Sequence, residues 1–253
     1  MGFRNCYDDV AYAEAYARLE FPGTYYLAFR DLPDLLARHV RGPQALDFGC
    51  GAGRSTRFLV AHGYKAIGVD VAPEMVRQAQ ACDPAGDYRL VADGDLRQFP
   101  EARFDLILSA FTFDNVPTGG QKAALFGELR RLLSVDGRIV NLVSVPEIYW
   151  HEWASFSTRD FPENRRANCG DEVRIVVTAL DDPRPAVDIL WPEEAYRDVY
   201  ARSGLRVLDL HRPLGRADEP YAWKTELRIS PWAIYVLARG EPVGSAASTE
   251  SVP

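Results

Sequence analysis

Cysteine and histidine are scarce in this chain of 253 residues, which contains four of each. The cysteines Cys6, Cys50, Cys82 and Cys169 are scattered, with no C-x-x-C pair and no tight grouping with histidines. Zinc sites and disulfide-stapled domains depend on such spacings. The sequence therefore indicates neither a metal site nor a disulfide framework.

Long hydrophobic runs and an excess of positive charge are also missing. No apolar stretch approaches the roughly 18 residues of a membrane-spanning helix, and the N-terminus lacks a signal-peptide pattern, so we expect a cytoplasmic protein without a membrane partner. Lys and Arg number 29 against 36 Asp and Glu, and the net charge of -7 argues against nucleic acid as a partner. With 47% hydrophobic residues, the chain can bury one large core, as a soluble enzyme does.

Glycine, by contrast, gathers at one informative place. The run A-L-D-F at residues 45–48 leads into Gly49, Gly51 and Gly53, directly before a helix-like stretch. Glycines allow a sharp turn from strand to helix and let a ligand lie against the main chain. A dinucleotide-binding loop would have its third glycine where Arg54 stands. The pattern therefore favours a different nucleotide-like cofactor.

Further segments follow this loop in a fixed order. They are K-A-I-G-V-D at 65–70, V-A-D-G-D-L at 91–96, F-D-L-I-L-S-A-F at 104–111 and L-R-R-L-L-S-V-D-G-R-I-V-N-L-V at 129–143. With the glycine loop, they make about residues 40–145 resemble a class I methyltransferase dependent on S-adenosylmethionine (SAM). The resemblance implies SAM as cofactor and an α/β, Rossmann-like sheet of seven strands in the order 3-2-1-4-5-7-6, with the last strand antiparallel. The SAM-binding domain is expected over residues 41–240.

The resemblance also implies a set of cofactor contacts. Asp70, at the end of a strand, would accept hydrogen bonds from the ribose hydroxyls, or else cap the helix that opens at Pro73. Asp95 would accept from the adenine amine while Leu96 packs on the ring, although D-G-D is also an ordinary solvated turn. Asp47 would lie near the methionine ammonium of the cofactor. The full expected set is Tyr7, Tyr16, Asp47, Gly49, Cys50, Gly51, Asp70, Val71, Asp95, Leu96 and Ser109.

One member of this set has a simpler interpretation. Cys50 stands between two glycines, and no basic group flanks it in sequence to lower its pKa. It is therefore better explained as a small buried filler than as a nucleophile.

Residues 1–40 are expected to form cap helices that close over the cofactor. One helix is predicted from residue 8 or 9 to 19 and a second over about 25–40, with Pro33 early enough to start a turn or kink. Tyr7 and Tyr16 are the leading candidates for contacts with the cofactor's carboxylate and sulfonium. Alternatively, these tyrosines pack the helices onto the sheet.

Residues 146–191 interrupt the family pattern after the fifth strand, and we interpret them as a lid over the substrate pocket. The segments V-R-I-V-V-T-A-L at 173–180 and A-V-D-I-L-W at 186–191 are typical of an antiparallel hairpin. The lid's first part holds the aromatic residues Tyr149, Trp150, Trp153 and Phe156. They favour an aromatic or apolar acceptor, or a minor hydrophobic core beneath the lid, and the two are compatible.

Two residues are candidates for the catalytic step. His151, at the start of the lid, is the candidate general base, or else a packed core imidazole. Asp114, in F-T-F-D-N-V-P, is a candidate to orient His151 or to bind a polar substrate group, although D-N-V-P also suits a helix-entry turn. The segment departs from the (N/D)-P-P-(Y/F) motif of methyltransferases that act on nucleic-acid or glutamine nitrogens. That departure counts against those substrates.

The end of the chain returns to the family pattern. A helix is predicted from Pro192 with Gly204 at its C-cap, then strands at 207–214 and 231–239. Between these strands, Tyr221, Trp223 and Lys224 are expected to reach toward the pocket, and residues 241–253 have the composition of a disordered tail.

Together these features predict an enzyme that transfers a methyl group from SAM to a small aromatic or apolar acceptor of specialised metabolism. One alternative is an enzyme of the same fold that catalyses a rearrangement or cyclisation. Another is a non-catalytic SAM-binding partner subunit. The acceptor atom stays open between oxygen, nitrogen, sulfur and carbon.

Overall fold

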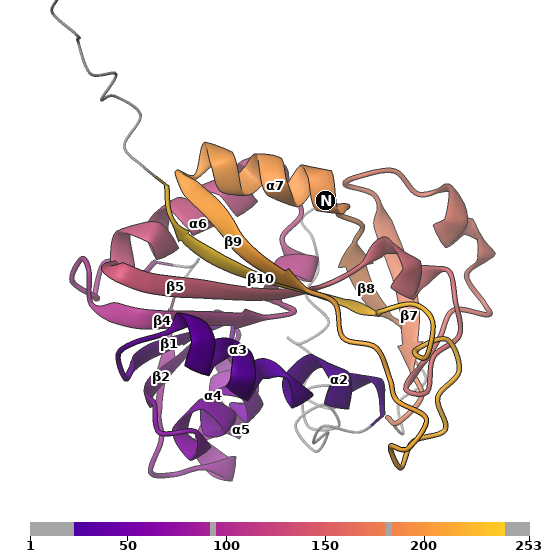
Figure 1. The fold of residues 1–253 in the computed structure, drawn as a ribbon, viewed down its shortest axis with the longest axis horizontal. Coiled ribbons are helices and arrows are strands. Elements are labelled where there is room, and N and C mark those ends of the chain that lie inside the picture. Colours follow the sequence, from indigo (N-terminus) through magenta and orange to yellow (C-terminus); the bar gives the residue numbers. More distant parts are fainter. Residues whose placement is uncertain (1–22, 92–94, 181–183, 241–253) are drawn as a thin grey trace, which may run out of the picture.

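The computed structural model describes residues 23–91, 95–180 and 184–240, which form a central sheet with helices on both faces (Figure 1). The sheet has the order β3-β2-β1-β4-β5-β10-β9, and β10 runs antiparallel to both of its neighbours. Its strands are β1 Gln44–Phe48, β2 Lys65–Asp70, β3 Asp87–Leu90, β4 Phe104–Ala110, β5 Leu133–Ser144, β9 Leu205–His211 and β10 Trp232–Arg239. The predicted order 3-2-1-4-5-7-6 is confirmed, since β9 and β10 are the sixth and seventh strands of this sheet along the chain.

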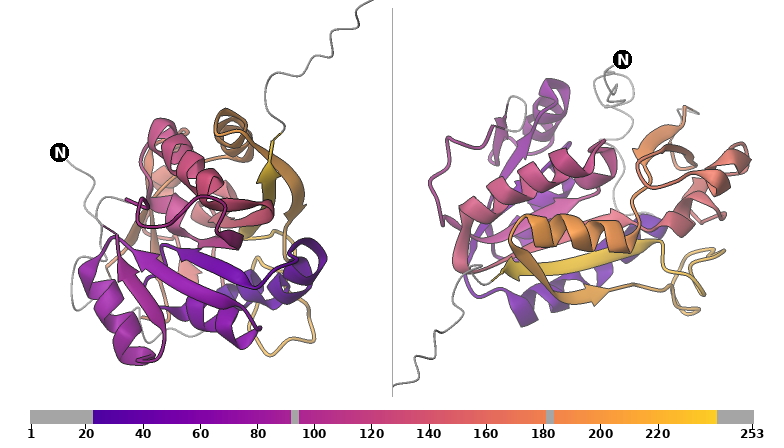
Figure 2. Two further views of the ribbon diagram at one scale, coloured as in Figure 1. Left: turned by 90° about the vertical axis from the view of Figure 1, so that its left-hand side faces the viewer. Right: turned by 90° about the horizontal axis from the view of Figure 1, so that it is seen from above.

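Helices α2 to α5 lie on one face of the sheet, and α6 and α7 on the other (Figures 1 and 2). Their bounds are α2 Thr24–Arg30, α3 Leu32–His39, α4 Arg54–Ala61, α5 Pro73–Cys82, α6 Gly119–Leu132 and α7 Glu193–Arg202. Short 3-10 turns are η3 Thr112–Asn115, η4 Pro146–Tyr149 and η5 Pro162–Arg166. None of the helices in the described ranges is long and apolar enough to span a membrane.

The central strands are apolar along their length because both of their faces are covered. In β1, Ala45 packs with the residues of α2 and α3, whereas Leu46 packs with those of α6 and α7. The same alternation separates Leu106 from Ile107 in β4. This pattern leaves the carboxyl ends of the parallel strands as the edge where polar side chains can meet a ligand.

A second, three-stranded sheet lies beyond those carboxyl ends, within residues 146–191, the segment that we call the lid (Figure 1). It consists of β6 Phe156–Ser157, β7 Glu172–Val177 and β8 Ala186–Ile189, and both strand pairs are antiparallel. The predicted hairpin is thereby confirmed. Its register pairs Val173 with Asp188 and Ile175 with Ala186, so Asp188 shares a face with buried apolar residues.

The predicted helix over about 25–40 is two helices, with a break at Asp31. Pro33, at the second position of α3, has no N–H to donate to the carbonyl of Phe29, so the first helix cannot continue regularly. Arg30 and Asp31 form an ion pair of 2.7 Å at the break. The expected helix over 8–19 and the expected tail at 241–253 lie outside the described residues.

Glu226 ties three distant segments together below the lid. It is fully buried, and its Oε1 accepts hydrogen bonds from the Thr24 hydroxyl (2.6 Å) and the Ala154 N–H (2.7 Å). Its Oε2 accepts from the Lys224 N–H at 2.9 Å. Thr24 and Ser155 also exchange two hydrogen bonds of 3.0 Å through each other's backbone N–H and hydroxyl oxygen. We call this contact the Glu226 junction; it fixes α2, the lid and the β9–β10 connection to one another.

We expect Glu226→Gln to destabilise the protein by about 2 kcal/mol, because an amide NH₂ would then face the Lys224 N–H donor in a buried place. For a chain of this size that corresponds to a fall in Tm of roughly 4 to 8 °C, measured by calorimetry. The matched control is Glu172→Gln on the exposed end of β7, which should stay within about 0.5 kcal/mol of the wild type. Equal Tm values for the two variants would contradict a structural role for the junction.

Candidate functional site

The glycine loop between β1 and α4 forms the first half of the site. Gly49, Gly51 and Gly53 have φ angles of 74°, 52° and 81°, in the region that side chains rarely adopt. A Cβ on Gly49 would lie 2.1 Å from Oγ1 of Thr112, whereas the nearest atom to a Cβ on Gly51 is 3.9 Å away. Gly49 is therefore required by packing inside the protein, and Gly51 borders open space where a ligand can approach the main chain.

Asp70 holds this loop from the end of β2. Its Oδ2 accepts a hydrogen bond from the Gly51 N–H at 2.8 Å, and its Oδ1 accepts from the Ala72 N–H at 2.9 Å. The N-cap of α5 is Ala72, with no side-chain cap, so Asp70 does not cap that helix in the usual way. A carboxylate oxygen can accept more than one hydrogen bond.

Asp47 lies beneath the loop and is fully buried. Its Oδ2 accepts hydrogen bonds of 2.6 Å from the hydroxyls of Ser55 and Thr56, while its Oδ1 has no hydrogen-bond partner among the described residues. Burial raises the pKa of this carboxyl to about 6, despite those two hydroxyl donors. A buried oxygen that lacks a donor can accept a hydrogen bond from an ammonium group, either directly or through a water molecule. Asp47 therefore suits the end of a cofactor that carries an amine.

The expected adenine contacts follow the ends of β2 and β3 along the chain. Val71 is 50% exposed just after Asp70 and offers an apolar surface. Leu96 is buried in the core, and the exposed Asp95 accepts from the Arg97 guanidinium at 2.6 Å, which holds the pKa of that carboxyl at about 2. An adenine amine would therefore share Asp95 with Arg97.

The remaining expected cofactor residues are placed differently. Cys50 packs against Val76, Ala79 and Tyr88, and burial raises the pKa of its thiol well above the ordinary value, as a structural filler requires. Ser109 is fully buried in β4 opposite Asn141, on the face toward α6 and α7, and its hydroxyl has no hydrogen-bond partner in the described ranges. Tyr7 and Tyr16 lie outside the described residues.

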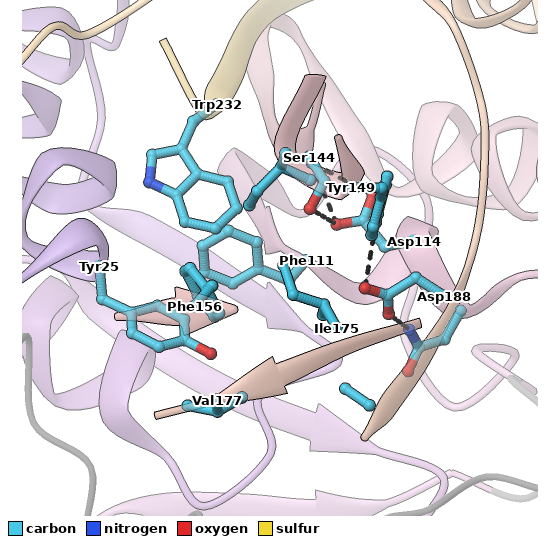
Figure 3. Close-up of a pocket in the computed structure, with 13 residues that line it drawn as sticks. Tyr25, Phe111, Asp114, Ser144, Tyr149, Phe156, Ile175, Val177, Asp188 and Trp232 are labelled. Atoms are coloured by element: carbon cyan, nitrogen blue, oxygen red, sulfur yellow. Dashed lines mark hydrogen bonds between the residues drawn. The ribbon is translucent and has the colours of Figure 1, made fainter. Parts of the chain in front are cut away.

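A pocket beneath the lid forms the second half of the site (Figure 3). It has a cavity volume of about 40 Å³, within about 450 Å³ of space that is partly open to solvent, between the lid sheet and the carboxyl ends of β4 and β5. One end is an aromatic wall, and the other end holds most of the polar groups. The wall consists of Tyr25, Phe111, Phe156 and Trp232, and the polar end of Asp114, Asn115, Ser144, Tyr149 and Asp188.

The pocket and the glycine loop share one segment of chain. Thr112 donates its hydroxyl to the carbonyl of Phe48 at 2.9 Å, while Phe111 and Asp114 on either side of it line the pocket. Phe111 has a φ of 65°, a strained value for a residue with a side chain. The segment therefore turns sharply so that one side contacts the cofactor loop and the other contacts the pocket.

Two carboxylates meet at the polar end of the pocket. Asp114 Oδ2 accepts from the Ser144 hydroxyl (2.7 Å) and N–H (3.0 Å). Asp188 accepts from the Tyr149 hydroxyl (3.0 Å) and the Asn115 side-chain amide (2.7 Å). Removal from water raises the pKa of both carboxyls, and the charge of Asp188 raises that of Asp114 further.

Lys122 lies on the far side of this acid pair. It is fully buried on α6, donates to the carbonyl of Phe113, and its Nζ lies 4.8 Å from the Trp191 ring. Burial lowers the pKa of its ammonium, and its positive charge acts on both carboxyls in the opposite sense to their desolvation. Lys122 does not line the pocket, so its positive charge offsets the negative charge of the two carboxylates from outside the cavity.

The structure does not bring the two predicted catalytic residues together. His151 packs edge-on against Trp153 with ring centroids 6.3 Å apart and does not line the pocket. The turn η4 directs Tyr149, two residues earlier, toward the pocket instead, and Asp114 bonds to Ser144 rather than to His151. The partner that sequence reasoning missed is Asp188, a single acid in the apolar run A-V-D-I-L-W on the same face as Ala186.

The lid aromatics divide between the two alternatives left open by the sequence. Tyr149 and Phe156 line the pocket. Trp153 is fully buried in a core beneath the lid and donates its indole N–H to the carbonyl of Ile148 at 2.8 Å.

The residues between β9 and β10 that were expected to reach the pocket do not line it; they are Tyr221, Trp223 and Lys224. Tyr221 packs on Tyr26, and Trp223 donates its indole N–H to the Arg216 carbonyl.

Comparison with known proteins agrees with this geometry. Residues 46–141 match the methyltransferase domain family. An uncharacterised methyltransferase of Bacillus licheniformis is 32% identical over 122 residues, which cover 46% of this chain and 55% of the relative. The chain thus spans about half the length of the curated relatives it matches.

Solved structures share the fold at low identity. A SAM-dependent methyltransferase from Mesorhizobium loti superposes with a TM-score of 0.60 at 20% identity, covering 84% of this chain and 98% of that one. The 1,6-didemethyltoxoflavin-N1-methyltransferase of Burkholderia thailandensis gives a TM-score of 0.52 at 18% identity, over 85% and 79% of the two chains. The fold is that of class I methyltransferases. Residues 46–141 match the methyltransferase domain family, and SAM is the cofactor named for solved neighbours that share this fold.

A methyl group at Gly51 should interfere with this cofactor. We expect Gly51→Ala and Gly63→Ala to cost about 1 kcal/mol of stability each, because both glycines have positive φ and neither Cβ would clash. The first variant alone should weaken binding of S-adenosylhomocysteine, the demethylated cofactor, in calorimetric titration. Unchanged binding by Gly51→Ala would show that the cofactor does not lie against this residue.

The buried Asp47 should also make stability depend on pH. Its carboxyl keeps its proton up to about pH 6 in the folded protein but loses it near pH 4 in the unfolded chain, so the folded state binds more protons between these values. This group's share of the unfolding free energy therefore falls, on the order of 2 to 3 kcal/mol, as pH rises from about 4 to about 6.

Urea unfolding of Asp47→Asn and of the wild type at several pH values measures the contribution of Asp47 to the unfolding free energy. The variant should gain stability relative to the wild type as pH rises through this range, whatever constant offset the substitution adds. The control Asp136→Asn, an exposed acid in β5, should show no such trend. A pH-independent difference for Asp47→Asn would contradict the prediction.

Proposed function

We propose that the protein transfers a methyl group from SAM to a small organic acceptor held in the pocket beneath the lid. The observation that carries the proposal is the segment Phe111–Asp114, which contacts the glycine loop on one side and lines the pocket on the other. A cofactor on the loop and an acceptor in the pocket would then be neighbours.

The chain's own residues would hold the cofactor at its two ends. Asp70 would accept the ribose hydroxyls while it keeps the Gly51 N–H in place. Oδ1 of Asp47, which has no partner among the residues that the structure describes, would face the amino group. Val71 would pack on the adenine. When bound, SAM supplies a methyl group on a positively charged sulfur, which is already activated for transfer.

The pocket would orient the acceptor and keep water away from it. Its aromatic wall suits a flat or apolar molecule, as the sequence predicts, and the Glu226 junction keeps Tyr25 and the lid against each other. The structural neighbour from Burkholderia thailandensis contains S-adenosylhomocysteine together with 1,6-didemethyltoxoflavin. That pairing supports a small molecule as the acceptor here. Positioning of this kind supplies a large part of the rate enhancement.

Calorimetric titration with SAM, S-adenosylhomocysteine and NADH tests the cofactor site. We expect about micromolar binding of the first two and none of NADH. Asp70→Ala should weaken binding at least tenfold, because it removes charge-assisted hydrogen bonds to ribose and the anchor of the Gly51 N–H. Asp87→Ala, which removes an exposed acid paired with Arg89 in β3, is the control and should bind normally. Absence of SAM binding in ligand-free protein would overturn the proposal.

Release of S-adenosylhomocysteine separates methyl transfer from the two alternatives. An acceptor screen that yields this product supports the proposal. Tight SAM binding with conversion of a substrate but no such release would instead indicate a rearrangement or cyclisation. Binding of SAM without any conversion would favour a partner subunit.

A further inference from the structure

From the two ends of the lid pocket, we infer that the acceptor carries a basic nitrogen, held at the acid pair Asp114 and Asp188, on a flat apolar body that lies against the aromatic wall. The inference rests on the proposed function and names its substrate class. Figure 3 shows the two acids on one side of the pocket and the aromatic rings on the other.

The first argument is the charge balance of the pocket. Asp114 is almost fully buried and Asp188 partly so, and a buried carboxylate is costly unless a cation or several donors compensate it. Lys122 is the cation that acts on both. Among the described residues, no Lys, Arg or His lines the pocket itself. Two acids thus face the cavity with one ammonium behind them, and a ligand cation would complete the pairing.

The aromatic wall gives a second, independent argument. Tyr25, Phe111, Phe156 and Trp232 pack with ring centroids 4.7 to 6.1 Å apart. Aromatic faces attract cations as well as apolar surfaces. A ligand that combines a flat body with a basic nitrogen therefore matches both ends of the pocket, whereas a carboxylate would meet repulsion at one end.

The acid pair can also accept the proton that such a nitrogen must lose before methyl transfer. A protonated amine has no lone pair, so one N–H proton must pass to a carboxylate oxygen before the nitrogen can act as a nucleophile. Asp188 can take that proton while the Tyr149 hydroxyl and the Asn115 amide hold its position. In the described part of the chain, the other ionisable groups that act with the pair are Tyr149 from η4, Lys122 from α6, and Tyr196 and Tyr200 from α7.

Three matched probes test the inference by binding rather than by activity. The whole chain of 253 residues, saturated with S-adenosylhomocysteine, is titrated calorimetrically with 2-phenylethylamine, 2-phenylethanol and phenylacetate. We expect the amine to bind about tenfold more tightly than the alcohol, the order of one charge-assisted hydrogen bond, and the acid to bind least. An alcohol or acid that binds as tightly as the amine, or an amine that does not bind, overturns the inference.

Two substitutions test whether the preference for the amine comes from Asp188. Asp188→Asn should bring the amine and the alcohol within about threefold of each other, with the affinity for S-adenosylhomocysteine unchanged. The matched control is Asp209→Asn, a remote acid bonded to His39, which should keep the full preference. Retention of the preference in Asp188→Asn would contradict the role of that acid.

A measurement on the wild type alone covers the case in which the variant does not fold. The raised pKa values leave part of the acid pair protonated near neutral pH, and a bound cation lowers them, so amine binding should release protons. Titrations in two buffers of different ionisation heat measure this release, and its absence overturns the inference. If S-adenosylhomocysteine itself does not bind, the proposed function fails. If it binds but the protein does not prefer the amine, only the inferred substrate class is overturned.

Discussion

The close contact between Thr112 and the glycine loop is the constraint on which the site depends. Thr112 donates to the Phe48 carbonyl, and its Oγ1 would lie 2.1 Å from any Cβ at residue 49. Only glycine, which also adopts the required positive φ, allows the end of β4 to approach the end of β1 this closely. This approach puts the glycine loop and the lid pocket on opposite sides of one short segment. The loop glycines therefore have two different purposes, because Gly49 serves this contact and Gly51 borders the ligand space.

The pocket is assembled from segments that are far apart in sequence. Tyr25 comes from α2, Phe156 from the lid and Trp232 from the start of β10, and the Trp232 indole donates to the Thr24 carbonyl at 2.9 Å. The Glu226 junction holds two of these segments together through a buried carboxylate with three donors. A charge buried with its full set of partners fixes one arrangement of the chain, because loss of any partner leaves the carboxylate uncompensated.

Local patterns explain which features could be predicted from the sequence. The strand order follows from a family resemblance carried by ordered motifs, and the lid hairpin from two apolar runs around a turn. The break at Asp31 was only half anticipated, because Pro33 signals a kink without its position. The pairing of Asp114 with Asp188 depends on how the lid docks onto the sheet, which no local pattern contains. His151 and Tyr149 stand two residues apart, and the geometry of one turn decides which of them faces the pocket.

The polar end of the pocket contrasts with the Glu226 junction in a way that bears on function. Glu226 is buried with three donors and forms part of the scaffold. Asp114 and Asp188 also accept hydrogen bonds, but they border a cavity, repel each other and share the charge of Lys122. Their removal from water raises the pKa of both carboxyls. A core under selection for stability alone would replace such a pair with apolar side chains, because these would pack without the desolvation cost. Perturbed carboxyls that face a cavity are typical of groups kept for a ligand or a proton. The cost of burying this acid pair is thus the physical reason to propose this end of the pocket, rather than His151, as the place where the acceptor is recognised.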